Sequence, residues 1–96
     1  MGSYRVSRRA KSDLISIYHW SEEAFGRRQA DRYAARFKEV FALLAAFPGL
    51  GFSADHVKRG LRRIDVGSHA VFYRETASGV LILAILHQRM RPDLHL

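Results

Sequence analysis

The sequence predicts a single α+β domain, residues 1–96, in which an N-terminal helical hairpin packs on a mainly antiparallel four-stranded sheet in the order βααβββ. Residues 8–25 and 28–47 carry apolar side chains at three- and four-residue spacing, which is typical of amphipathic helices. Residues 61–66, 69–74 and 80–86 are short apolar segments joined by brief links, which predicts an antiparallel meander. A chain of 96 residues is long enough for one compact core.

Local residue types set the first strand and the helix boundaries. Tyr4 and Val6 alternate with polar neighbours, which indicates a short strand, and Ser7 can cap the first helix. Gly26 suits the end of that helix because glycine accepts the left-handed conformation, and Pro48 ends the second helix. The helical stripes place five large aromatic residues in the core: Trp20, Phe25, Phe37, Phe41 and Phe47.

The last strand is apolar at every position from Val80 to Leu86. Two helices cover only one face of a sheet, and a strand whose other face meets water alternates between apolar and polar residues. Two explanations are open. Either sheet twist and curled strand ends hide both faces, or a bound partner polypeptide covers the second face.

Composition narrows the function classes. The absence of cysteine excludes disulfides and thiolate metal sites, and the five histidines have no metal-ligand spacing. No phosphate-binding loop motif occurs, so we expect neither a metal nor a cofactor. No apolar run has the length of a membrane span and the N-terminus has no apolar signal core, so we expect a cytoplasmic protein without membrane contact.

The net charge of +7, from 16 Lys and Arg against 9 Asp and Glu, predicts attraction to an acidic partner, either nucleic acid or an acidic protein segment. Two basic groups stand out, residues 58–63 and Arg74 with residues 87–91. Arg63, Arg74 and His87 could converge on one side of the meander, where arginines hold a phosphate and a histidine moves a proton, as RNA cleavage through the 2′-hydroxyl requires. Alternatively, Arg63 pairs with Asp65, and His87 and His69 are structural hydrogen-bonding residues.

Four segments together resemble ParE toxins of the ParE/RelE superfamily. They are Tyr4–Leu14, the turn Phe47–Gly51, Arg62-Arg63 followed by Gly67–Arg74, and the closing segment Ile85–Met90. The resemblance implies the toxin half of a type II toxin–antitoxin pair that stabilises plasmids, with the RelE/ParE fold. Such a toxin inhibits DNA gyrase by binding it, and a ParD-like antitoxin neutralises the toxin and binds operator DNA for the complex.

The resemblance also implies an alternative function. The RelE branch is made up of ribosome-dependent mRNA endoribonucleases that use basic residues plus a tyrosine or histidine near the C-terminus. His87 could fill that place, with Arg63 and Arg74 near the matching arginines. No tyrosine follows Tyr73, however, so the chain lacks the C-terminal tyrosine of the RelE pattern. This difference favours the non-catalytic branch of the superfamily, whose members inhibit gyrase. A third reading is an inactive relative that only binds its antitoxin.

We therefore expect two sets of binding residues. The target-binding set is Arg63, His87, Arg89, Met90 and Arg91. The antitoxin-binding set combines helix-hairpin aromatic residues, if they are exposed, with arginines of the sheet: Trp20, Phe25, Arg62 and Arg74.

Overall fold

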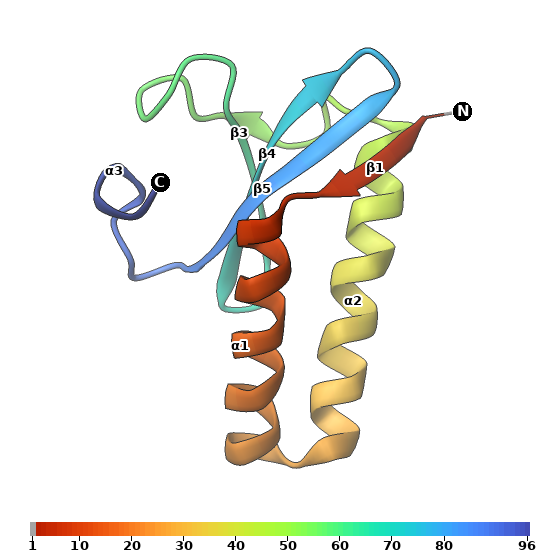
Figure 1. The fold of residues 1–96 in the computed structure, drawn as a ribbon, viewed down its shortest axis with the longest axis vertical. Coiled ribbons are helices and arrows are strands. Elements are labelled where there is room, and N and C mark those ends of the chain that lie inside the picture. Colours follow the sequence, from red (N-terminus) through yellow and green to blue (C-terminus); the bar gives the residue numbers. More distant parts are fainter. Residues whose placement is uncertain (1) are drawn as a thin grey trace.

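A five-stranded sheet carries a helical hairpin on one face in the computed structural model, which describes residues 2–96 (Figure 1). The elements are β1 Ser3–Val6, α1 Arg8–Phe25, α2 Arg27–Ala46, β2 Phe52–Ser53, β3 Arg62–Val66, β4 His69–Thr76, β5 Gly79–His87 and α3 Pro92–His95. The predicted α+β class and element order are confirmed. Two short elements, β2 and α3, were not predicted, because two and four residues are too few to show periodicity.

The sheet has the order β1-β5-β4-β3-β2. β1 runs parallel to β5, and the remaining neighbours are antiparallel, so the predicted meander of β3, β4 and β5 is confirmed. The helical hairpin returns the chain between β1 and the meander. This arrangement places β5 inside the sheet, between β1 on one side and β4 on the other.

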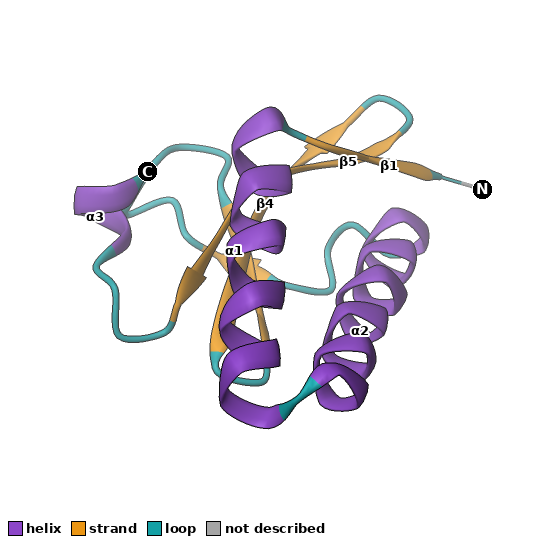
Figure 2. Cartoon of the chain, turned by 60° about the horizontal axis from the view of Figure 1, so that its bottom comes forward, coloured by secondary structure: helices purple, strands orange, loops and turns teal. Residues whose placement is uncertain are grey.

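The two residues predicted to mark the ends of the first helix, Ser7 and Gly26, do so in the structure. The hydroxyl of Ser7 accepts a hydrogen bond from the Ala10 N–H at 3.0 Å, which caps α1 as predicted. Gly26 has φ +89°, and its N–H donates to the Glu22 carbonyl at 2.8 Å. Because glycine adopts this conformation without steric cost, α1 ends and α2 begins within one residue, and the helices lie antiparallel (Figure 2).

The main core lies between the hairpin and the sheet. Phe37 and Phe41 are 1% exposed in it, as predicted. Trp20, Phe25 and Phe47 are instead 44%, 63% and 61% exposed, so their predicted burial is wrong. Figure 1 shows that the closed end of the hairpin extends beyond the sheet, so strands cover this end of the helical stripe only in part. Trp20 still contacts His69 of β4 with its ring.

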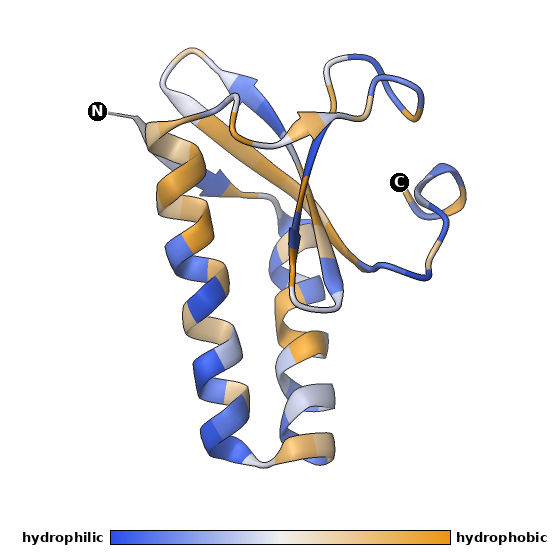
Figure 3. Cartoon of the chain, turned by 180° about the vertical axis from the view of Figure 1, so that it is seen from behind, coloured by the Kyte–Doolittle hydropathy of each residue, from blue (hydrophilic) through white to orange (hydrophobic). Residues whose placement is uncertain are grey.

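A second, smaller apolar cluster covers part of the other sheet face. Residues 54–61 fold across that face, so the chain itself provides this part of the cover. β5 is apolar along its length (Figure 3) because it contributes to both layers. The residues buried in the second cluster are Ala54, Leu61, Ala70, Phe72 and Leu86, with Val57 and Leu83 packed against them.

A bulge interrupts β5 at Leu83, which has no partner in β4 because Phe72 pairs with Ala84 and Tyr73 with Ile82. β1 ends opposite Ile82, so the part of β5 that follows Ile82 has no strand beside it on that side. There Ser7 and the first turns of α1 bind the backbone of β5 in place of a strand. The Ser7 hydroxyl donates to the Leu83 carbonyl at 2.9 Å, and Asp13 accepts from the Ile85 N–H at 2.9 Å.

Candidate functional site

The predicted convergence of Arg63, Arg74 and His87 is wrong. Arg63 of β3 lies opposite Phe72 of β4, and both side chains lie on the face of the second cluster. Arg74 comes two residues after Phe72 in β4, so its side chain lies on the same face. His87 pairs with His69, whose ring contacts Trp20, Tyr33 and Phe37 on the helical face. The sheet therefore separates the histidine from both arginines, and the three side chains cannot act on one phosphate.

Arg63 is engaged within the fold. Its Nε donates to an Asp65 carboxylate oxygen at 2.9 Å, so the alternative of a pair along one strand face is confirmed. The guanidinium also lies 5.8 Å from the ring centroid of Phe52 and 5.6 Å from that of Phe72. A carboxylate and two rings thus surround the side chain that was expected to meet a target.

Buried His69 is a structural residue, as the alternative interpretation held. The Tyr33 hydroxyl lies 2.8 Å from the Val66 carbonyl and 2.7 Å from His69 Nδ1. A hydroxyl has one proton, so when Tyr33 donates to the carbonyl, His69 Nδ1–H donates to Tyr33. Burial, followed by the nearby charge of His87, lowers the pKa of His69 from 6.5 to about 4. His69 is therefore neutral at pH 7.

The residues after β5 form an exposed tip. His87 Nδ1 accepts from the Arg89 N–H at 3.2 Å, and its carbonyl accepts from the Met90 N–H at 2.9 Å. Gln88 fixes the tip to the β3–β4 turn through its side-chain amide, which donates to the Gly67 carbonyl at 2.8 Å. Arg91 pairs with Asp93 at 2.6 Å. Four of the five predicted target-binding residues thus lie together, and Arg63 lies apart on the other face.

Arg62, predicted to bind an antitoxin, holds a loop within the fold. Its Nη2 donates to the carbonyls of Gly49 and Gly51 at 3.1 and 2.6 Å. Fully buried Tyr73 holds the same loop, donating to the Pro48 carbonyl at 2.8 Å and accepting from the Gly51 N–H at 2.9 Å. Sequence reasoning missed this pair. The signal was available, because alternation places Arg62 on the core face beside Ile64, where a guanidinium needs acceptors.

Trp20 and Phe25 form an exposed aromatic pair with ring centroids 5.8 Å apart and an edge-on geometry. They line one side of a hollow of about 370 Å³ beneath the β3–β4 turn, and Arg32 and Arg36 line another part of it. The exposure that antitoxin contact requires is therefore present. Arg74 lies elsewhere, in a hollow with Asp55 and Glu75, so the predicted antitoxin set does not form one surface.

Two other site classes can be assessed for the described part of the chain. Among residues 2–96, no group of three or more histidine, aspartate or glutamate side chains is placed to hold a metal ion. In the same range, none of the helices combines the length and the apolarity that crossing a membrane requires.

Comparison with known proteins identifies the family. Residues 4–92 match the family described as ParE toxin of type II toxin-antitoxin system, parDE. Toxin ParE1 of Caulobacter vibrioides is 42% identical over 96 residues, which cover 100% of this chain and 99% of that protein. Toxin ParE1 of Mycobacterium tuberculosis is 33% identical over 94 residues, covering 97% and 96% of the two chains. A solved structure described as a chromosomal ParDE TA system from P. aeruginosa shares the fold, with a TM-score of 0.78. The two chains are 21% identical, and the match covers 91% of this chain and 96% of the chain in that structure. The chain belongs to the ParE toxin family of type II toxin–antitoxin systems.

Proposed function

We propose that this chain inhibits DNA gyrase by binding it, and that a ParD-like antitoxin produced with it in the cytoplasm neutralises it. The observation that carries the proposal is the family match over residues 4–92, supported by 42% identity to a ParE1 toxin along the whole chain. In the complex, the antitoxin rather than this chain contacts the operator DNA.

The placement of the basic residues supports docking rather than catalysis. His87 lies on the opposite face of the sheet from Arg63 and Arg74, so the endoribonuclease alternative lacks the joint site it needs. The tip after β5 instead presents Arg89 and Met90, both exposed, on a backbone that is anchored to the β3–β4 turn. A cationic, apolar surface on a fixed backbone suits an acidic protein partner, because little chain entropy is lost when it docks.

A supercoiling assay tests the proposal. Purified gyrase is incubated with relaxed plasmid and an excess of this chain, and we expect supercoiling to stop. A variant with Arg89→Ala and Met90→Ala should inhibit much less, whereas Arg59→Ala, an exposed arginine of the 54–61 segment, should inhibit like the native chain. Unimpeded supercoiling at toxin excess would contradict the gyrase proposal.

The same chain, induced in cells without an antitoxin, tests the alternative. Mapping of mRNA 5′ ends should reveal no discrete cuts within translated frames. Cuts that disappear in a His87→Ala variant would establish the endoribonuclease function instead. Harmless overexpression would indicate an inactive relative.

A further inference from the structure

The two border strands of the sheet leave different amounts of backbone unpaired. β2 has only two residues, whereas β1 has four, of which the first three are exposed. Figure 1 shows β1 at the border of the sheet, with no strand outside it. An unpaired strand edge presents N–H and C=O groups that can pair with another polypeptide. β1 is therefore the longer open edge of this fold.

Alternation along β1 identifies the free backbone groups. The N–H groups of Ser3 and Ser7 donate to carbonyls of the β4–β5 turn and of β5, at 2.8 and 2.9 Å. Since successive residues of a strand direct their backbone groups to opposite sides, the N–H and C=O groups of Gly2, Tyr4 and Val6 point outward. A row of donors and acceptors thus follows the outer edge of β1.

A hollow of about 390 Å³ lies beside this edge, on the helical face of the sheet. Tyr4 lines it from β1, with a ring that is 38% exposed and lies 5.6 Å from the ring of Phe41 between centroids. The α2 residues that line the hollow are Ala42, Ala45 and Ala46. Because alanine side chains are short, α2 leaves room beside β1 for the side chains of an incoming strand.

We propose that two copies of this chain pair antiparallel through β1, around a two-fold axis at Tyr4, so that their sheets become continuous. In this register, the Tyr4 residues of the two copies exchange both of their outward hydrogen bonds. Gly2 of each copy does the same with Val6 of the other copy. The outward N–H groups of both copies then all have acceptors, and the two Tyr4 rings lie side by side in the hollows.

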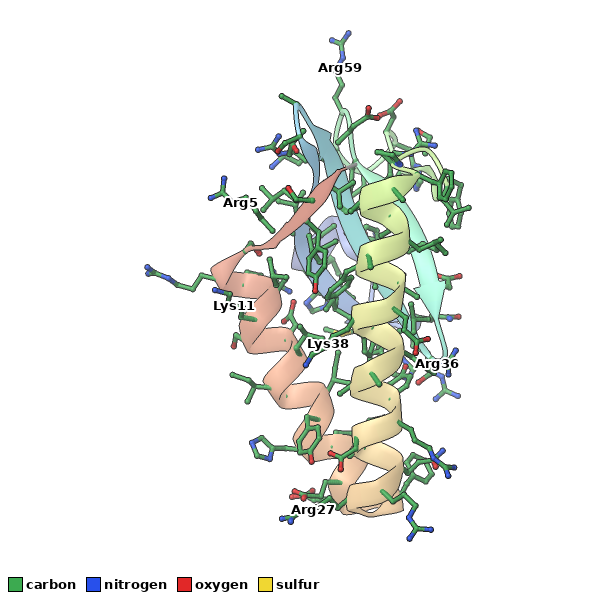
Figure 4. The ribbon with its side chains drawn as sticks, turned by 90° about the vertical axis from the view of Figure 1, so that its right-hand side faces the viewer. Arg5, Lys11, Arg27, Arg36, Lys38 and Arg59 are labelled. Atoms are coloured by element: carbon green, nitrogen blue, oxygen red, sulfur yellow. The ribbon has the colours of Figure 1, made fainter. Side chains whose placement is uncertain are left out.

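The charge on β1 favours this register over its neighbour. Ser3 and Arg5 lie on the sheet face opposite to Tyr4, and Figure 4 shows Arg5 directed away from α2. With the axis at Tyr4, Arg5 of one copy lies opposite Ser3 of the other. An axis at Arg5 would place the two guanidinium groups directly opposite each other, which destabilises strand pairing. It would also leave the outward groups of Gly2 without partners.

The size of the interface sets the expected affinity. Interfaces contain one hydrogen bond for about every 100–200 Å², so about six backbone bonds correspond to about 600–1,200 Å² of buried surface. This area lies at or below the lower limit for stable complexes. Each copy also carries a net charge of +7, and this repulsion is screened beyond about 8 Å at physiological ionic strength. We therefore expect a reversible dimer, with a Kd of about 1–100 μM, that becomes tighter as salt is added.

Sedimentation equilibrium of the purified chain alone, from about 1 to 300 μM, measures this dimer. Ser3→Glu places a carboxylate opposite Arg5 of the other copy and should lower the Kd by about threefold or more, whereas Ser3→Arg should raise it by a similar factor. Ser12→Glu and Ser12→Arg, at an exposed position of α1, change the net charge equally and should alter the Kd by less than about twofold. Circular dichroism verifies that each variant is folded.

The absence of cysteine allows the register itself to be tested. With the axis at Tyr4, the Cα atoms of residue 3 in one copy and residue 5 in the other lie about 4.5 Å apart, which a disulfide can span. Residue 3 lies about 8 Å from its own equivalent, as does residue 5, which is too far. Ser3→Cys and Arg5→Cys chains should therefore form a cross-linked dimer when they are mixed and oxidised, and neither should do so alone.

The outcomes do not depend on the proposed function, because the chain is tested without any partner. A monomer at every concentration would overturn the inference, as would a dimer that responds equally to Ser3→Glu and Ser12→Glu. Cross-linking of Ser3→Cys with itself would show that the register is wrong. If the chain alone is monomeric and the Tyr4 amide gains protection from hydrogen exchange only when the proposed antitoxin is added, this edge binds the antitoxin and not a second copy.

Discussion

Acidification should destabilise this fold through one buried histidine. The pKa of His69 is about 4 in the folded chain, against 6.5 for an ordinary histidine, because burial and the nearby charge of His87 oppose protonation. Between pH 6.5 and pH 4, the unfolded chain therefore binds a proton that the folded chain does not bind. The free energy of unfolding must fall as the pH drops through this window, and it stops falling from this cause below about pH 4, where both states are protonated.

The size of the loss follows from the same two values. Each tenfold difference in proton affinity corresponds to about 1.36 kcal/mol, so a pKa of about 4 instead of 6.5 gives on the order of 3 kcal/mol. That is a large part of the 5–15 kcal/mol typical of a small domain. The geometry of His69 explains this loss of stability. Its Nδ1 is already hydrogen-bonded to Tyr33 at 2.7 Å, so a second proton must bind at Nε2 of a ring that packs against Trp20 and Phe37.

Urea unfolding at pH 7, 6, 5 and 4, followed by circular dichroism, measures this effect. His69→Asn retains a polar atom near Tyr33 but cannot be protonated in this range. Carboxylates titrate in both chains, so only the difference between the two chains reports His69. Between pH 7 and pH 4, the free energy of unfolding of the native chain should fall by about 3 kcal/mol more than that of the variant. His56→Asn, at an exposed position, should retain the native pH profile. A difference between the native chain and His69→Asn that stays constant with pH would refute the reasoning.

Three further substitutions have defined structural consequences. Tyr73→Phe leaves the buried N–H of Gly51 without its acceptor and should cost about 1–3 kcal/mol in denaturant unfolding, while retaining the helical circular dichroism signal. Ser7→Ala removes both the α1 cap and the bond to the bulged strand, and should lower the free energy of unfolding by about 1–2 kcal/mol in the same assay. Gly79→Ala should destabilise by more than about 1 kcal/mol, because φ is +154° there and an added Cβ would overlap the Ser3 carbonyl; a melting temperature equal to that of the native chain would contradict this.

The sequence predicts the architecture because each element has its own local signal. Helical spacing places Phe37 and Phe41 in the core, and Ser7 and Gly26 mark the ends of α1. The same spacing fails for Trp20 and Phe25, because periodicity says which side of a helix a residue occupies but not how far the sheet extends beneath it. The hollow and the loop held by Tyr73 and Arg62 depend on contacts between distant segments; alternation along β3 indicates that Arg62 faces the core, but it does not indicate which carbonyls the guanidinium reaches.

The bulge at Leu83 explains why the predicted catalytic set fails. Arg74 pairs with Leu81, and with strict alternation the odd-numbered residues of β5 would stay on that face, which would place His87 on the same face as Arg74 and Arg63. One extra residue reverses the alternation for every later position, so Ile85 and His87 turn to the helices and Leu86 turns to the second cluster. Ser7 donates to the carbonyl of the bulged residue Leu83, and Asp13 accepts from the Ile85 N–H two residues further along, so both bonds stabilise the bulge.

The consequence of that reversal extends from the core to the surface. Ile85 completes the main core, and His87 reaches His69 and orients the tip, whereas the two arginines remain on a face that residues 54–61 partly cover. A chain that cleaved RNA with these residues would need them on one accessible face. In this chain a single bulged residue places Ile85 in the main core and His87 on the helical face, and the side chain of Gln88 anchors the exposed tip that follows.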